Sequence, residues 1–128
     1  EIGGASCILA IGTNTVENHP VIFLQIKKAI KNGCKLIVAD PREIGLCGLA
    51  HAWLRHNPGT DVPLLMGMAR VILDEGLPDM EFIEKRCENF EAFKASLSNF
   101  EPGWVSEVTG VPAKDIAAAA RTFAGNSP

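Results

Sequence analysis

The feature that most constrains the fold is a pair of short apolar runs, residues 7–11 and 35–39, joined by a segment of helical periodicity. Unbroken apolar runs of this length are typical of strands buried on both faces of a sheet. Between them, Pro20 suits a first helical turn, and Asn32-Gly33 suits a helix end. A helical connection between two such strands predicts parallel pairing with a right-handed crossover.

The remaining sequence predicts one more strand and then only helices. We expect a short helix over residues 43–49 and a third strand at 52–54. After that strand we expect a helix from the N-cap Thr60 to about residue 75 and another from about 79 to 87. A third helix is marked by the apolar stripe Phe90, Phe93, Leu97 and Phe100, and two more should begin at Pro102 and Pro112. The pattern predicts an α/β fold, namely a Rossmann-like three-layer domain with a short parallel sheet and a helical C-terminal half.

Length and chain ends predict how this domain is organised. We interpret residues 1–128 as a single domain, with a nucleotide-binding half over about 1–60 and a mostly helical half over about 61–128. The chain begins without Met and ends on a loop-like segment, so we expect it to be excised from a longer protein.

Charge, hydropathy and cysteine spacing exclude several classes of function. A net charge of −3 with interspersed acids and bases argues against a nucleic-acid partner. Apolar runs such as residues 8–11 are far too short for direct membrane insertion. No pair among Cys7, Cys34, Cys47 and Cys87 has C-x-x-C spacing, which argues against a zinc or iron–sulfur site. Reduced thiols behaving as small apolar groups suggest a cytoplasmic location.

The expected ligand site lies beyond the carboxyl ends of the strands, where open parallel sheets bind ligands. Three segments arrive there: residues 12–19, 40–42 and 58–61. In the first of them we expect residues 13–19 to form a polar loop. Gly12 allows a tight turn, Thr13 and Asn14 add side-chain donors, and the helix beginning near Pro20 points its N-terminus at the same edge, which favours a phosphate. A plain strand-to-helix turn is the alternative, and the full G-x-G-x-x-G fingerprint is absent.

Two acidic residues in the other segments suggest nucleoside recognition. Asp40 follows the second strand, where a carboxylate can accept from ribose hydroxyls, and Pro41 and Arg42 could fix the turn and face a phosphate. Asp61 begins a helix, and its carboxylate could accept from N1–H and the exocyclic amine of guanine. The alternatives are a turn with a surface cation for Asp40 and compensation of the helix dipole for Asp61.

The histidines carry a weaker signal. His51 and His56 flank the third strand, and no Ser, Cys or second acid is placed to complete a triad with them. We interpret both as structural. His19 precedes Pro20 and could cap the helix or touch a phosphate.

An ordered set of motifs resembles the molybdopterin oxidoreductases. Residues 13–20 resemble their N-x-x-x-x-H-P segment, residues 35–42 their K-L-I-V-x-D-P-R strand, and residues 58–61 their P-G-T-D turn. Further matches follow in the same order at residues 72–77, 82–83, 109–112 and 119–121, so the resemblance covers essentially the whole chain. Within this family the chain is most similar to the large (alpha) subunit of formate dehydrogenases, with nitrate reductases as near relatives.

The resemblance implies a cofactor and its contacts. Enzymes of this family hold molybdenum or tungsten between two molybdopterin guanine dinucleotides, each lying on a Rossmann-like domain, and this chain resembles one such domain. The motifs imply contacts from Gly12, Thr13 and Asn14 to the phosphates, from Asp40, Pro41 and Arg42 to the ribose side, and from Gly59, Thr60 and Asp61 to guanine. Glu17 and His19 lie in the first motif and are part of the expected site.

The resemblance also implies what this chain does not hold. The family's 4Fe-4S cysteines and its metal-ligating Cys or selenocysteine are expected upstream and a catalytic Arg downstream, so no catalytic residue or metal ligand is assigned here. The expected partners are the remaining domains of its own chain and electron-transfer subunits. The implied reaction of the parent enzyme is two-electron oxidation of formate to carbon dioxide, and the isolated chain should be inactive. The alternatives are a nitrate reductase, an NAD(P)-binding domain of another enzyme, and a structural domain without a ligand.

Overall fold

A three-stranded parallel sheet forms the centre of the computed structural model, which describes residues 2–126. Its strands are β1 (Cys7–Ile11), β2 (Lys35–Ala39) and β3 (Ala52–Leu54), in the order β1-β2-β3. The register pairs Ile11 with Ala39 and Ala39 with Leu54. The three strands therefore end level with one another, and the segments that follow them leave from one edge.

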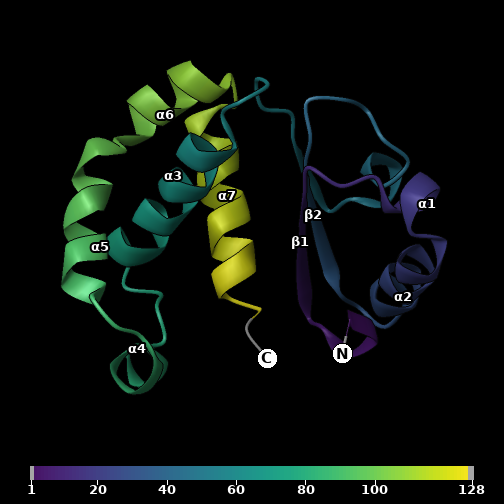
Figure 1. Cartoon of the computed structure of the whole chain (residues 1–128), viewed down its shortest axis with the longest axis horizontal. Helices are drawn as coiled ribbons and strands as arrows, with labels where there is room; N and C mark the ends of the chain where they lie inside the picture. The colour runs from purple at the N-terminus through teal and green to yellow at the C-terminus, as the bar shows by residue number, and fades with distance from the viewer. Residues whose placement is uncertain (1, 127–128) are drawn as a thin grey trace.

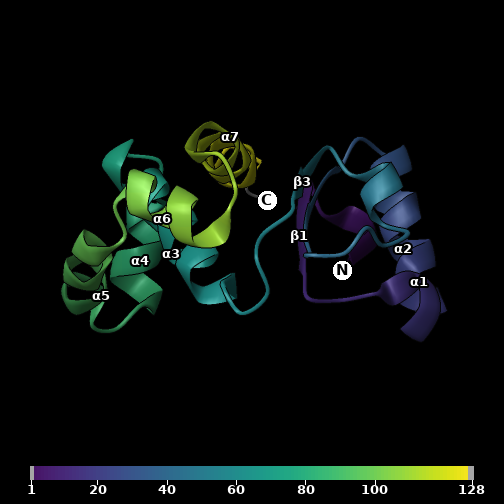
Figure 2. The same cartoon turned by 90° about the horizontal axis from the view of Figure 1, so that it is seen from above.

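Helices cover both faces of the sheet, as Figures 1 and 2 show. One face carries η1 (Ile2–Gly4), α1 (Thr15–Asn18) and α2 (Pro20–Lys31), and the other carries α7 (Ala113–Ala124) with α3 (Asp61–Asp74) and α6 (Pro102–Thr109) beyond it. Successive side chains of β2 point to opposite faces of the sheet. Leu36 and Val38 pack with α2, while Ile37 and Ala39 pack with α3, α6 and α7. The prediction of a three-layer α/β domain is confirmed.

The C-terminal half is helical, as predicted. After α3 come α4 (Met80–Arg86), α5 (Phe90–Ser96) and η3 (Leu97–Asn99), followed by α6 and α7. The carboxylate of Asp79 caps α4 by accepting from the backbone N–H of Phe82 at 2.9 Å. The guanidinium of Arg70 on α3 donates to the carbonyl oxygen of Leu97 at 3.1 Å, which fastens the short helices to the longer ones.

Two local predictions are wrong. The helix expected over residues 43–49 is only a single 3₁₀ turn, η2 (Cys47–Leu49). Ile44 and Leu46 are both buried in the cluster beneath α2, and an α-helix would point residues two apart in nearly opposite directions. The loop expected over residues 13–19 contains α1, which ends before Pro20 because proline has no N–H to continue its hydrogen bonding.

All four cysteines are free thiols, and burial is the main cause that raises the pKa of Cys7 and Cys34 above the ordinary value. Within residues 2–126, no group of three or more His, Cys, Asp or Glu side chains is arranged to hold a metal ion. Across the same range, no helix has the length and apolar character needed to span a bilayer.

Candidate functional site

The three predicted segments leave the sheet at its carboxyl edge, which faces the viewer in Figure 2. The backbone N–H of Gly12 donates to the carbonyl oxygen of Ala39 at 3.2 Å. On the other side, the indole Nε1 of Trp53 donates to the carbonyl oxygen of Asp40 at 2.9 Å, and Nε of Arg55 donates to that of Pro41 at 3.1 Å. These bonds tie the ends of the strands together, so residues distant in sequence share one rim.

The segment after β1 contains buried polar atoms without partners. Gly12 turns the chain at φ +58°, a conformation that favours glycine. Beyond it, the Asn14 side-chain oxygen and the Thr15 hydroxyl take part in no hydrogen bond with any residue from 2 to 126, although both atoms are buried. An unpaired buried polar group costs about 1–3 kcal/mol, so such groups are uncommon and each calls for an explanation. Thr15, only 5% exposed, is a residue that sequence reasoning missed.

Glu17 and His19 stand at the surface of the same segment. Glu17 is exposed on α1. His19 lies between α1 and α2 and occupies the N-cap position of α2, yet its side chain makes no capping hydrogen bond. The short helix α1 begins at Thr15, between Gly12 and α2. The first helix N-terminus after β1 is therefore that of α1, whereas the sequence suggested that of α2.

Asp40 combines a structural role with a remaining acceptor. Its side chain is 2% exposed, and Oδ1 accepts from the backbone N–H of Arg42 at 2.8 Å, which closes a turn around Pro41. Nε of Arg42 lies 3.5 Å from the same oxygen, while the guanidinium is 74% exposed. The turn with a surface cation is therefore present, and Oδ2 accepts no hydrogen bond from the described residues.

The third segment turns at Gly59, whose φ is +80°, and then starts α3. Thr60 occupies the N-cap position but does not cap with its side chain, contrary to the prediction. Its hydroxyl instead donates to the carbonyl oxygen of Asn57 at 2.7 Å, because the turn folds back over that residue. Asp61 is half-exposed, and its Oδ1 lies 3.2 Å from Nε2 of the buried His56.

Arg55 is a second residue of this rim that sequence reasoning missed. Its guanidinium carbon lies 5.5 Å from the centre of the Trp53 ring, in a cation–π arrangement. The alternation of β3 places Trp53 and Arg55 on the same side of the strand, which is the signal that could have revealed the pair. Together they place an exposed positive charge beside the Asp40-Pro41 turn.

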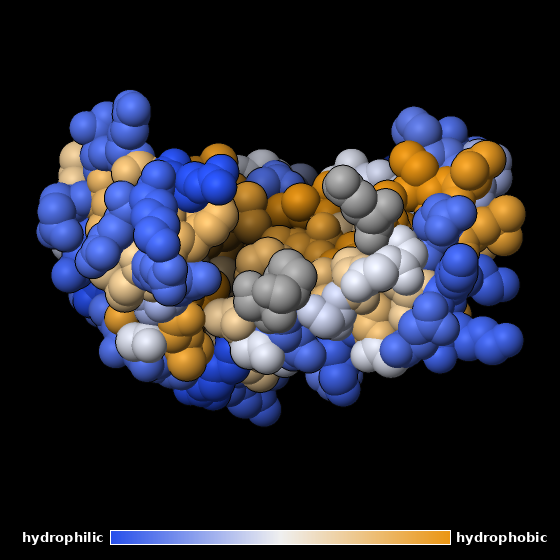
Figure 3. Space-filling view, turned by 90° about the horizontal axis from the view of Figure 1, so that it is seen from below, coloured by the Kyte–Doolittle hydropathy of each residue, from blue (hydrophilic) through white to orange (hydrophobic). Residues whose placement is uncertain are grey.

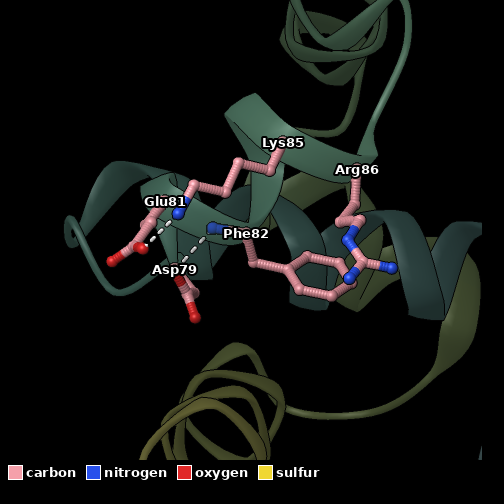
Figure 4. Close-up of a pocket in the computed structure, with 5 residues that line it drawn as sticks. All are labelled: Asp79, Glu81, Phe82, Lys85 and Arg86. Atoms are coloured by element: carbon pink, nitrogen blue, oxygen red, sulfur yellow. Dashed lines mark hydrogen bonds and ion pairs between the residues drawn. The ribbon is translucent and has the colours of Figure 1, made fainter.

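A surface hollow in the helical half lacks this convergence. Figure 4 shows a hollow lined by α4 and its cap, where Lys85 pairs with Glu81 at 2.5 Å and Phe82 lies beside Arg86. All of its lining residues come from one short segment, so no other element within residues 2–126 contributes side chains to it. Figure 3 shows the edge opposite the rim, where apolar side chains gather in patches among charged ones.

A parallel sheet with helices on both faces and polar loops at its carboxyl edge defines a three-layer α/β domain, and open parallel sheets bind ligands at that edge. The model of the molybdopterin oxidoreductase family matches residues 1–116, and the chain belongs to this family.

Relatives and a solved structure agree with this membership. The chain is 42% identical to acetylene hydratase of Syntrophotalea acetylenica, 38% to a periplasmic nitrate reductase of Desulfovibrio desulfuricans and 34% to formate dehydrogenase H of Escherichia coli, with 97% of the chain covered each time. The structure of acetylene hydratase from Pelobacter acetylenicus superposes on the whole chain with a TM-score of 0.95 at 40% identity.

The chain spans only 17–18% of the length of these proteins. The family implies a molybdopterin cofactor in the parent protein. Because the relatives carry out different reactions by name and are similarly identical, membership extends to the family and not to one enzyme within it.

Proposed function

We propose that this chain is the domain that holds the guanine dinucleotide part of one molybdopterin cofactor in a larger molybdenum or tungsten enzyme. The observation that carries the proposal is the pair of buried, unpaired polar atoms, Asn14 Oδ1 and Thr15 Oγ1, at the carboxyl edge of the sheet. The Thr15 hydroxyl can donate to a phosphate oxygen, and the Asn14 side-chain oxygen, which only accepts, suits a hydroxyl of the ligand. The donor set therefore fits a nucleotide.

Each segment of the rim has a role in this proposal. Gly12, Thr13, Asn14 and Thr15 bind the phosphates, with Glu17 and His19 bordering them at the surface. The Asp40-Pro41-Arg42 turn binds the ribose side through the remaining carboxylate oxygen and the exposed guanidinium. Gly59, Thr60 and Asp61 receive the guanine. The exposed half of the Asp61 carboxylate is the acceptor that distinguishes guanine from adenine.

When bound, the metal–pterin centre supplies the redox chemistry. The residues of this chain bind the dinucleotide, orient it against the rest of the enzyme and exclude water from its buried side. Partners in this proposal are the other domains of the parent protein and its electron-transfer subunits.

For the parent enzyme we propose formate oxidation, because the motif set resembles formate dehydrogenases and several of the relatives bear that name. Acetylene hydration is the second candidate, favoured by the 42% identity and the 0.95 TM-score. Purified parent enzyme should reduce a viologen dye with formate. Conversion of acetylene without formate-dependent dye reduction would replace the first candidate with the second.

The domain proposal is tested by nucleotide titration of this chain, followed by two-dimensional NMR of its backbone amides. GDP should shift amides of the three rim segments, while ADP and NAD should have smaller effects. Asp61→Asn should weaken GDP binding and favour XDP, because xanthine carries an oxygen where guanine carries the amine and an amide can donate to it. Asp115→Asn is the matched control, because Asp115 is also an acidic residue in the first turn of a helix, α7.

The outcome separates three explanations. Loss of GDP binding with gain of XDP binding in Asp61→Asn, and neither change in Asp115→Asn, supports guanine recognition. Equal changes in stability alone for both variants would show that Asp61 only compensates the helix dipole. Tight NAD binding without a GDP response would contradict the proposal.

A further inference from the structure

The side chain beneath Asp61 is a histidine that the proposed function does not use. His56 is buried, with 1% of its side chain exposed, whereas the Asp61 side chain is 47% exposed. Nε2 of the imidazole lies 3.2 Å from Asp61 Oδ1. A carboxylate only accepts hydrogen bonds, so Nε2 must carry the proton in this contact. The buried ring thus holds one oxygen of the carboxylate from below.

The local backbone fixes this ring in place. The backbone N–H of His56 donates to the carbonyl oxygen of Leu54 at 3.0 Å. The neighbouring Asn57 is anchored to the C-terminal end of α6, since its backbone N–H donates to Thr109 O at 2.8 Å and its side chain to Val108 O at 3.1 Å. The imidazole is therefore a rigid donor rather than a mobile surface group.

We propose that His56 is a positioning residue that selects guanine through Asp61, an inference that rests on the proposed function. The Nε2–H holds Oδ1, which restricts rotation of the carboxylate, so Oδ2 and the outward lone pairs of Oδ1 face the ligand. Two acceptors in one plane match the N1–H and exocyclic amine of guanine, a pair of donors that adenine lacks. Because the carboxylate is already ordered, guanine binding has a smaller entropy cost for immobilising this side chain.

The test compares His56→Leu, His56→Gln and the wild-type chain by titration with GDP and with ADP. Leucine fills the buried position without a donor, while glutamine can place an N–H near the position of Nε2. Losing a donor to a half-exposed carboxylate should weaken GDP binding about fivefold to tenfold in His56→Leu. Binding of ADP should not change, and His56→Gln should recover GDP affinity to within about twofold of wild type.

The double variant His56→Leu/Asp61→Asn shows whether His56 acts through Asp61. In the Asp61→Asn background, His56→Leu should cause no further loss of GDP affinity, because the two residues form one unit. Nitrogen-detected NMR of the wild-type chain should show Nε2 protonated, and GDP should shift that resonance.

The two proposals fail in different ways. If His56→Leu binds GDP as wild type does while Asp61→Asn loses it, the positioning role is wrong and guanine recognition stands. Equal weakening of GDP and ADP in His56→Leu would show a purely structural role and would also overturn the inference. If Asp61→Asn binds GDP normally, the proposed function and this inference are both wrong.

Discussion

Replacing Thr15 by valine should stabilise the free chain and weaken nucleotide binding. Its hydroxyl is buried and unpaired among residues 2–126, and valine has nearly the same shape and the same branching at Cβ. Removing an unpaired buried hydroxyl recovers its desolvation cost, about 1–3 kcal/mol. For a domain of this size, each kcal/mol raises the Tm by about 4 °C, so the expected increase is about 4–12 °C.

Thr109→Val is the matched control, because Thr109 is equally buried but fully paired. Its hydroxyl donates to the carbonyl oxygen of Val105 at 2.7 Å and accepts from the backbone N–H of Val111 at 3.2 Å. Valine at this position leaves the Val111 N–H without its partner, so Thr109→Val should destabilise the chain by about 1–3 kcal/mol. The two substitutions are chemically identical and should change stability in opposite directions.

Both effects are measured on the same proteins. Urea denaturation of the wild-type, Thr15→Val and Thr109→Val chains gives the free energies of unfolding, and GDP titration gives the affinities. Loss of a hydroxyl donor to the ligand should weaken GDP binding of Thr15→Val about twofold to tenfold. If Thr15→Val lowers the free energy of unfolding by more than about 1 kcal/mol, the hydroxyl is already satisfied in the free chain and the argument from unpaired atoms is refuted.

Two further predictions concern the helical half. Gly67→Ala on α3 should destabilise the chain by about 1–2 kcal/mol, because its Cβ would lie 2.7 Å from Cγ1 of the buried Val105. Gly103→Ala, which has open space around it, should be neutral or stabilising by up to about 1 kcal/mol. Denaturant midpoints that rank the two variants the other way would contradict this packing argument. The paired guanidinium of Arg121 lowers the pKa of Glu75, so the pair stabilises the fold above the ordinary carboxyl pKa and loses this effect as the pH falls through the lowered value. Glu75→Gln should therefore be less stable than wild type near neutral pH, and this difference should shrink as the pH falls below the ordinary carboxyl pKa. A difference that stays constant over that range would contradict the ion-pair explanation.

The sequence alone determined the elements that rest on strong periodicity or on residues with a single conformational meaning. The apolar runs at residues 7–11 and 35–39 became β1 and β2, and the helix ends at Gly33 and Gly76 have positive φ angles of 99° and 67°. The meeting of three segments at one edge also followed from the sequence, because parallel strands with helical connections all end on the same side.

Only the tertiary structure decided the details that depend on partners distant in the chain. Ile44 and Leu46 prevented the expected helix because both are buried on one side, and local propensity contains no information about that cluster. The unpaired hydroxyl of Thr15 and the contact of His56 with Asp61 arise from burial and side-chain direction, which no spacing rule supplies. Sequence patterns therefore place a segment at the rim, and packing decides which atoms of that segment are left for a ligand.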